Sequence, residues 1–169
     1  MIRDTYKIIS TPMGWIGLLW SDLGLKRCTL PCRKYAQAMY NLRLGSSCYE
    51  ADHYASRLIK ISKHLADYFS GLKPNFEASL DLIGTDFQQS VWLVTSSIPY
   101  GTTQSYSWGA SQVGKPQSYR AVGQALKANP VPIFIPCHRV ISSSNKLGGY
   151  AGTSGLDIKE QLLKLEGYM

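Results

Sequence analysis

Short apolar runs separated by turn residues occupy the first thirty positions of the chain. Residues 7–9, 15–20 and 25–30 are apolar or alternate between apolar and polar, and residues 12–14 and 21–24 separate them with Pro, Gly, Ser and Asp. This pattern predicts a small antiparallel sheet.

Helical periodicity begins after Asp52. Apolar side chains recur at i, i+4, i+7, i+11 and i+14, and Ser70 and Gly71 end the pattern. These positions are Tyr54, Leu58, Ile61, Leu65 and Tyr68. An amphipathic helix is predicted here, and the polar, irregular stretch 73–81 after it marks the expected domain junction.

The second half of the chain predicts mainly helices. Thr85 and Gln88 form a capping box at the start of a helix that ends before Pro99. Two short helices, 106–113 and 118–128, flank a Gly-Lys-Pro turn and make a candidate helix-turn-helix. A last helix is expected over residues 156–165.

Composition restricts the class of protein. The chain has 169 residues, of which 44% are hydrophobic and 17% charged, so it has enough apolar material for a core and is too apolar to be disordered. The longest apolar stretches, 14–20 and 131–136, are too short to span a bilayer, and the first residues lack the apolar region of a secretory signal. We therefore expect a cytoplasmic protein without a membrane segment.

The distribution of charge suggests an anionic partner. The formal net charge is +7, and residues 87–156 contain five basic side chains and no carboxylate. A block of this length without an acid suits a surface that lies against phosphates.

The cysteines are too few and too irregularly spaced for a disulfide scaffold. They are Cys28, Cys32, Cys48 and Cys137. Cys28 and Cys32, with His53 and His64 downstream, raise the question of a zinc site, but no closely spaced histidine pair follows them. Isolated thiols in a core are the better interpretation, and we predict no metal and no cofactor.

The segment 129–140 contains the candidate chemistry. An apolar run between prolines leads to Cys137 and His138, and Pro136 restricts the chain that enters Cys137. A thiol is a useful nucleophile only as a thiolate, which an adjacent imidazole or a cation can favour. A Cys-His pair alone is more often structural than catalytic.

The surroundings of this pair are more specific. Pro-Cys-His-Arg-Val, preceded by Asn-Pro-Val-Pro-Ile, resembles the active-site signature of the O6-alkylguanine-DNA alkyltransferases, also called methylated-DNA–protein-cysteine methyltransferases. The match continues in register at Ser105-Tyr106, Arg120-Ala121-Val122-Gly123, Gly148-Gly149-Tyr150-Ala151-Gly152 and Lys159-Glu160-Gln161-Leu162-Leu163. It covers roughly residues 85–168.

The resemblance implies two domains. Residues 1–80 would form an α/β domain with a small ribonuclease-H-like antiparallel sheet and helices. Residues 81–169 would form a mostly α, winged-helix-like domain with the helix-turn-helix, which binds DNA and transfers the alkyl group.

The same resemblance assigns catalytic roles. Cys137 would accept the alkyl group, and His138 would take the thiol proton, through a water. Glu166 would orient and stabilise the imidazolium, as in a triad. Tyr106 would hydrogen-bond the base and help protonate it as it leaves. Asn129 would tie the recognition helix to the active-site segment.

Contacts with DNA and with the substrate base follow in the same way. Because a base inside a duplex is out of reach, the nucleotide would be flipped out, and Arg120 would fill the space that it leaves. The small Ala121 and Gly123 would let the helix approach the groove. The other expected DNA contacts are Ser105, Lys127 and Arg139.

The alkylated base would be held by the active-site segment and by the loop around Tyr150. The carbonyls of Cys137 and Val140 and the amide of Ala151 would read the guanine edge. Tyr150 would cover the alkyl group, and Pro132 would line the pocket. Ala151 replaces a serine of some relatives.

A second departure lies in the helix-turn-helix. Trp108-Gly109 is an unusual pair inside its first helix, where glycine costs about 1 kcal/mol of helix stability.

The function expected from these features is DNA repair. The protein would transfer the alkyl group from O6-alkylguanine in double-stranded DNA to its own Cys137, irreversibly and once per molecule, as a monomer and without a cofactor. The sequence leaves open whether O4-alkylthymine is repaired. Two other classes compete: an alkyltransferase-like protein that binds the lesion without transfer, which would lack the acceptor cysteine, and a cysteine hydrolase that turns over repeatedly.

Overall fold

Two units, Met1–Leu82 and Ile83–Met169, make up the chain in the computed structural model. The structure describes residues 4–51, 56–73, 76, 78–144, 147 and 153–169.

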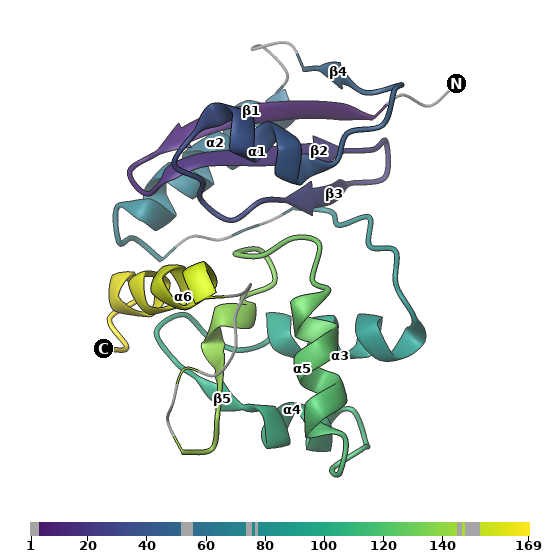
Figure 1. The fold of residues 1–169 in the computed structure, drawn as a ribbon, viewed down its shortest axis with the longest axis vertical. Helices are drawn as coiled ribbons and strands as arrows, with labels where there is room; N and C mark the ends of the chain where they lie inside the picture. The colour runs from purple at the N-terminus through teal and green to yellow at the C-terminus, as the bar shows by residue number, and fades with distance from the viewer. Residues whose placement is uncertain (1–3, 52–55, 74–75, 77, 145–146, 148–152) are drawn as a thin grey trace. The chain divides into compact units, whose positions relative to one another are not determined.

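The N-terminal unit is built on a four-stranded sheet with the strand order β3-β2-β1-β4 (Figure 1). The strands β1 (Thr5–Thr11), β2 (Gly14–Trp20) and β3 (Leu25–Cys28) are antiparallel neighbours. The short β4 (Tyr49–Glu50) runs parallel to β1. The antiparallel part of this sheet is the one that the sequence predicts.

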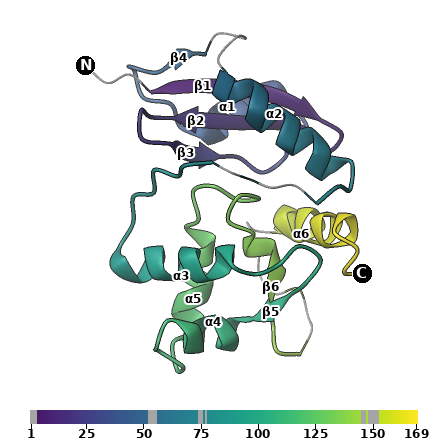
Figure 2. The same ribbon diagram turned by 180° about the vertical axis from the view of Figure 1, so that it is seen from behind.

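One helix covers each face of the sheet, as Figures 1 and 2 show from opposite sides. These helices are α1 (Tyr35–Leu42) and α2 (Ser56–Phe69). The helix α1 packs closely on β2 because Gly17 has no side chain: a Cβ there would lie 2.6 Å from Cγ of Leu42. Ile16 and Leu18 of β2 are fully buried.

The sequence predicts α2 but not α1. Ile61, Leu65 and Tyr68 of α2 are buried as the periodicity requires, whereas Tyr54 lies outside the described residues. The helix α1 has eight residues, of which only Ala38 and Leu42 are buried, and no side chain caps its N-terminus. Its apolar side chains do recur at i, i+3, i+4 and i+7, at Tyr35, Ala38, Met39 and Leu42, so what the sequence lacks here is the cap that marks the start of a helix.

Three helices form the centre of the C-terminal unit: α3 (Asp86–Ser96), α4 (Tyr106–Gln112) and α5 (Tyr119–Lys127). The predicted capping box is present at the start of α3, where Thr85 and Gln88 exchange hydrogen bonds. The indole of Trp92 is buried and donates a hydrogen bond of 2.8 Å to the carbonyl of Ala125, which joins α3 to α5.

The unusual glycine in α4 is explained by packing. Gly109 is buried, and a Cβ on it would lie 3.3 Å from Cγ1 of Val122 in α5. The missing side chain lets the two helices of the helix-turn-helix approach each other, at the cost of helix propensity.

The rest of this unit carries the Cys-His segment. It comprises a parallel pair of two-residue strands, β5 (Gln104–Ser105) and β6 (Val140–Ile141), the 3₁₀ helix η1 (Cys137–Arg139) and the last helix α6 (Thr153–Leu165). The helix α6 begins three residues before the predicted start.

No helix in the described part of the chain combines the length and the apolar character that a bilayer span requires. Within the same residues, no three His, Cys, Asp or Glu side chains gather as metal ligands do. His53 lies outside the described residues. Cys28 and Cys32 are buried thiols, and burial raises the pKa of both, which makes them poor nucleophiles.

Candidate active site

Cys137 opens η1 at the end of the proline-rich segment. Pro136 precedes it, and the amide of Cys137 donates to the carbonyl of Ile135 at 2.8 Å. The side chain is 5% exposed and packs in a core cluster with Ile98, Val122 and other apolar residues. The thiol is therefore held at the surface of the core by a stiff backbone.

Asn129 links this thiol to the end of α5. Its Nδ2 donates to the carbonyl of Ile135 at 2.9 Å and to Sγ of Cys137 at 3.2 Å. Its Oδ1 accepts from the amide of Val131 at 3.0 Å. A hydrogen-bond donor at this distance favours the thiolate over the thiol.

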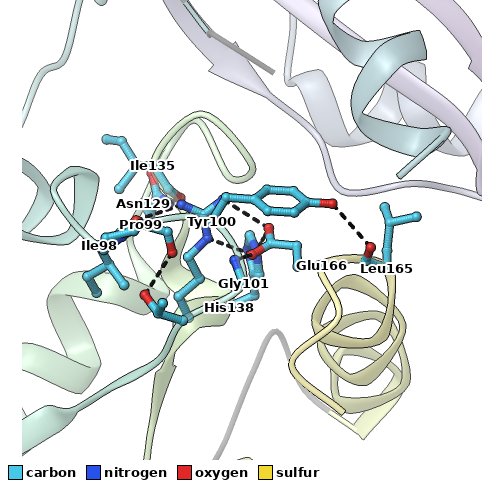
Figure 3. A network of polar contacts seen from close by, with 11 residues as sticks. Ile98, Pro99, Tyr100, Gly101, Asn129, Ile135, His138, Leu165 and Glu166 are labelled. Atoms are coloured by element: carbon cyan, nitrogen blue, oxygen red, sulfur yellow. Dashed lines mark hydrogen bonds and ion pairs between the residues drawn. The ribbon is translucent and has the colours of Figure 1, made fainter. Parts of the chain in front are cut away.

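His138 and Glu166 are paired. Nε2 of His138 lies 2.7 Å from Oε1 of Glu166, and both side chains are fully buried (Figure 3). Since a carboxylate only accepts hydrogen bonds, Nε2 carries the proton and Nδ1 is the basic nitrogen. Burial lowers the pKa of His138 even though Glu166 opposes the shift, so the imidazole rests in its neutral form.

The carboxylate of Glu166 accepts hydrogen bonds from several groups. Besides His138, its carboxylate accepts from Arg139 and, at 3.2 Å, from the amide of Gly101, which adopts a φ of 74° in a turn after α3. Burial alone would raise the pKa of Glu166, but the hydrogen bonds from His138 and Arg139 outweigh it and lower the pKa to about 2. A charge that the helix dipole disfavours at the end of α6 is thus stabilised by its partners.

Arg139 is buried rather than exposed. Its Nε lies 2.8 Å from Oε2 of Glu166, its Nη2 3.0 Å from Oε1, and its Nη1 donates to the carbonyl of Ile98 at 2.7 Å. The guanidinium group lies over the ring of Tyr100, whose hydroxyl donates to the carbonyl of Leu165 at 3.1 Å. Arg139 therefore fixes Glu166 in place.

Lys159 is a further charged group near the thiol. The side chain is fully buried, and Nζ donates to the carbonyl of Val140 at 2.6 Å. Nζ also lies 5.9 Å from the ring centre of Tyr106. Burial lowers the pKa of Lys159 to about 8, against an opposing effect of Cys137. Burial and the nearby Cys137 raise the pKa of Tyr106, so its hydroxyl stays protonated and can donate.

This arrangement fits nucleophilic chemistry on a thiol. It contains a thiol next to an amide donor and a lysine, a neutral imidazole fixed by a carboxylate, and a phenol that can act as an acid.

Comparison with known proteins agrees with this chemistry. Residues 86–168 match the family model "6-O-methylguanine DNA methyltransferase, DNA binding domain". A methylated-DNA–protein-cysteine methyltransferase of Methanosarcina barkeri is 44% identical over 161 residues, which cover 95% of this chain and 96% of the relative. The chain belongs to this family.

Solved structures support the assignment. Mycobacterium tuberculosis OGT in complex with DNA has a TM-score of 0.78 and 36% identity, over 96% of this chain and 92% of that one. The O6-methylguanine-DNA methyltransferase of Pyrococcus kodakaraensis has a TM-score of 0.63 and 25% identity, over 97% and 99%. The predicted family and two-part fold are confirmed, and so are DNA repair by alkyl transfer to a cysteine and DNA as the partner.

The residues expected to contact DNA occupy different environments in this methyltransferase. Arg120, Ala121 and Lys127 of α5 are exposed. Gly123 is half-buried beside Tyr106, and a Cβ on it would lie 3.7 Å from Cε1 of that ring, which is an ordinary van der Waals contact. Ser105 caps α4 by accepting from the amide of Trp108 at 3.0 Å.

One of these expectations is wrong. Arg139 cannot serve as a DNA contact, because its guanidinium group is occupied by Glu166 and Ile98 inside the unit.

The substrate residues are only partly described. Pro132 and Val140 are buried, and the Val140 carbonyl already accepts from Lys159. Tyr150 and Ala151 lie outside the described residues, as does the rest of the loop 148–152.

Sequence reasoning missed Lys159 and the segment 98–101. Lys159 stands three and four positions before the fully buried Leu162 and Leu163, so helical spacing already places it on the core face of α6.

Proposed function

We propose that Cys137 is the acceptor of this methyltransferase and that O6-alkylguanine in double-stranded DNA is its substrate. The observation that supports this is the hydrogen bond of 3.2 Å from Asn129 to Sγ of Cys137, beside the buried Lys159. Both groups favour a thiolate at this position. Cys32 also accepts from an amide, Nδ2 of Asn41 at 3.4 Å, but burial outweighs that contact and raises its pKa, as it raises that of Cys28, so the nearby ammonium group of Lys159 is what distinguishes Cys137.

The reaction follows from the groups around the thiol. His138 takes the thiol proton at Nδ1, by way of a water, and Glu166 stabilises the imidazolium. The thiolate attacks the alkyl carbon bonded to O6; an S–C bond forms, the C–O6 bond breaks, and its electrons remain on the guanine. Tyr106 donates a proton to the departing base. No group restores the thiol, so each molecule reacts once.

Recognition of the lesion uses the other predicted residues. The base leaves the duplex, and Arg120, exposed near the start of α5, fills its place in the stack while Lys127 contacts phosphates. The carbonyl of Val140, oriented by Lys159, accepts from the guanine edge; Pro132 supports the pocket.

The described residues of the site come from positions 98–166 of one chain, which supports action as a monomer. It also supports a domain boundary near residue 80, with the alkyl-transfer chemistry in the second domain and a packing role for the first. A reducing cytoplasm suits a protein whose thiol must remain free.

Intact-mass measurement tests the proposal. The protein is incubated with excess duplex containing O6-methylguanine and then mapped by peptide. We expect a mass gain of one methylene group per chain, located on Cys137, and none in Cys137→Ser. Cys48→Ser, at a half-buried cysteine of the other unit, is the matched control and should react like the wild type. Repeated turnover, or modification of another cysteine, would contradict the proposal.

A further inference from the structure

Ile133 has a backbone conformation that isoleucine rarely adopts. Among the described residues, the non-glycine residues with positive φ are Arg43, at 51°, and Ile133, at 78°. Arg43 is an exposed cap at the end of α1, a common place for this conformation. Ile133 is branched at Cβ and 1% exposed, and it lies four residues before Cys137. For a β-branched residue, positive φ is strained.

The strain lies in a tight turn. Residues 133 and 134 form the turn, and the amide of Ile135 donates to the carbonyl of Val131 at 3.0 Å. Pro132 fixes φ at the position before Ile133. The hydrogen bond from Ile135 to Val131 joins residues four apart and so closes a five-residue α-turn with Ile133 at its middle position, where glycine would take the positive φ without strain.

The surroundings hold the turn in this conformation. Val131 and Ile135 are fully buried on either side of Ile133. Asn129 bridges the two ends of the turn, accepting from the amide of Val131 and donating to the carbonyl of Ile135. The backbone at Ile133 cannot relax without moving a buried side chain out of its place. Strain of this kind persists only where the structure around it is over-determined, and it gathers at functional sites.

The turn is connected directly to the thiol. The carbonyl of Ile135 accepts from Asn129 and also from the amide of Cys137, at 2.9 and 2.8 Å. The same Nδ2 of Asn129 donates to Sγ of Cys137. A turn that relaxed would shift the Ile135 carbonyl, and with it both the amide of Asn129 and the start of η1.

We infer that Ile133 is a positioning residue for alkyl transfer: its buried side chain anchors a strained turn that holds the Cys137 thiol against Asn129. This inference rests on the proposed role of Cys137 as the acceptor.

Two truncations separate the anchor from the strain. Ile133→Ala and Ile133→Gly both remove the side chain, but only glycine accepts the positive φ without strain. We expect the glycine variant to have the higher folded-to-unfolded ratio, by about fivefold or more. Ile141→Ala and Ile141→Gly are the matched control, because Ile141 is buried in the same unit with ordinary φ, and there glycine should be the less stable of the two.

Reactivity should follow the same order. Without the anchor, alanine leaves the positive φ and the turn relaxes, so the alanine variant should methylate Cys137 more slowly than the glycine variant, by about threefold or more, in single-turnover assays under conditions where both are folded. The pH at which iodoacetamide labels Cys137 at half its maximal rate should also rise most in the alanine variant, since Asn129 no longer stays against Sγ.

Each result decides between the possibilities. If the wild type does not methylate Cys137, the proposed function fails. If it does, but the alanine variant reacts as fast as the glycine variant with an unchanged labelling profile, or if the glycine variant is the less stable of the two, the role of Ile133 is refuted. Should neither truncation fold, Ile133→Leu decides, because it keeps the volume and lacks the branch at Cβ. It should be at least as stable as the wild type and keep its rate within about twofold; lower stability would overturn the inference.

Discussion

Lys159 places an ammonium group inside the C-terminal unit, where its Nζ donates to the carbonyl of Val140. Lowering its pKa from 10.5 to about 8 means that the protonated side chain destabilises the fold by about 3 kcal/mol relative to a lysine in water. Lys159→Met keeps the apolar stem and removes this charge. It also leaves the buried Val140 carbonyl without its donor, which costs about 1 to 3 kcal/mol. We therefore expect Lys159→Met to be more stable than the wild type by about 1 kcal/mol at pH 7.

The pH dependence of this gain identifies its cause. The folded pKa of Lys159, about 8, lies below its unfolded value of 10.5, so between these pH values the unfolded chain binds more protons than the folded one. Wild-type stability therefore gains a contribution as the pH rises from 8 to 10.5, which the methionine variant lacks. The advantage of Lys159→Met should be constant below pH 8 and decrease above it.

Urea unfolding of both proteins from pH 7 to 10.5 measures this difference, because the other titrating groups are common to the two chains. Alkyl transfer should slow about tenfold in Lys159→Met, since a charge-assisted contact that orients Val140 and favours the thiolate is lost. A variant that is less stable at pH 7, by an amount independent of pH, would show that the lysine is stabilising and that the reasoning is wrong.

Four other variants test the rest of the site. Because the pKa of Glu166 is lowered to about 2, its stabilising charge is lost as the pH falls from 4.5 to 2. The difference in unfolding free energy between the wild type and Glu166→Gln, measured by acid unfolding, should therefore shrink by about 3 kcal/mol over that range. The difference would not change with pH if Glu166 were solvated. Arg139→Met should cost about 3 to 5 kcal/mol by leaving Glu166 uncompensated. Lys127→Met should leave the free energy of unfolding within about 0.5 kcal/mol of the wild type and reduce the number of ions released on DNA binding by about one. If instead Arg139→Met kept its stability and reduced the number of ions released, Arg139 would again count as a DNA contact. Arg120→Ala should slow repair of duplex DNA about thirtyfold and spare free O6-benzylguanine, and equal loss on both would make Arg120 structural.

Local patterns in the sequence predict most of the elements. The periodicity of α2, the capping box of α3 and the turn between α4 and α5 all depend on residues within a few positions of one another. The roles of Cys137, His138 and Asn129 come instead from the resemblance to the alkyltransferases, because a Cys-His pair alone is more often structural than catalytic. The helix α1 has helical spacing of apolar residues but is only eight residues long and has no side-chain cap to mark its start.

Long-range contacts account for what the sequence did not predict. Arg139 reads as a phosphate contact because no acid lies near it in the chain, yet Glu166, 27 residues later, neutralises it in the interior. Helical spacing places Lys159 on the core face of α6, but lysine is rarely buried, and only the fold brings the carbonyl of Val140 to its ammonium group. The positive φ of Ile133 cannot be predicted from the sequence, because any apolar residue would fit the hydrophobic pattern at this position.

Gly109 has consequences beyond helix packing. Tyr106 lies on α4 and Arg120 on α5, so the missing methyl group that sets the spacing of these helices also sets the distance between the proposed acid for the leaving base and the side chain proposed to take the place of that base. An alanine at 109 would require a shift of a few tenths of an ångström against Val122. A substitution at this buried position would therefore change how base extrusion is coordinated with alkyl transfer, without altering either of these two side chains.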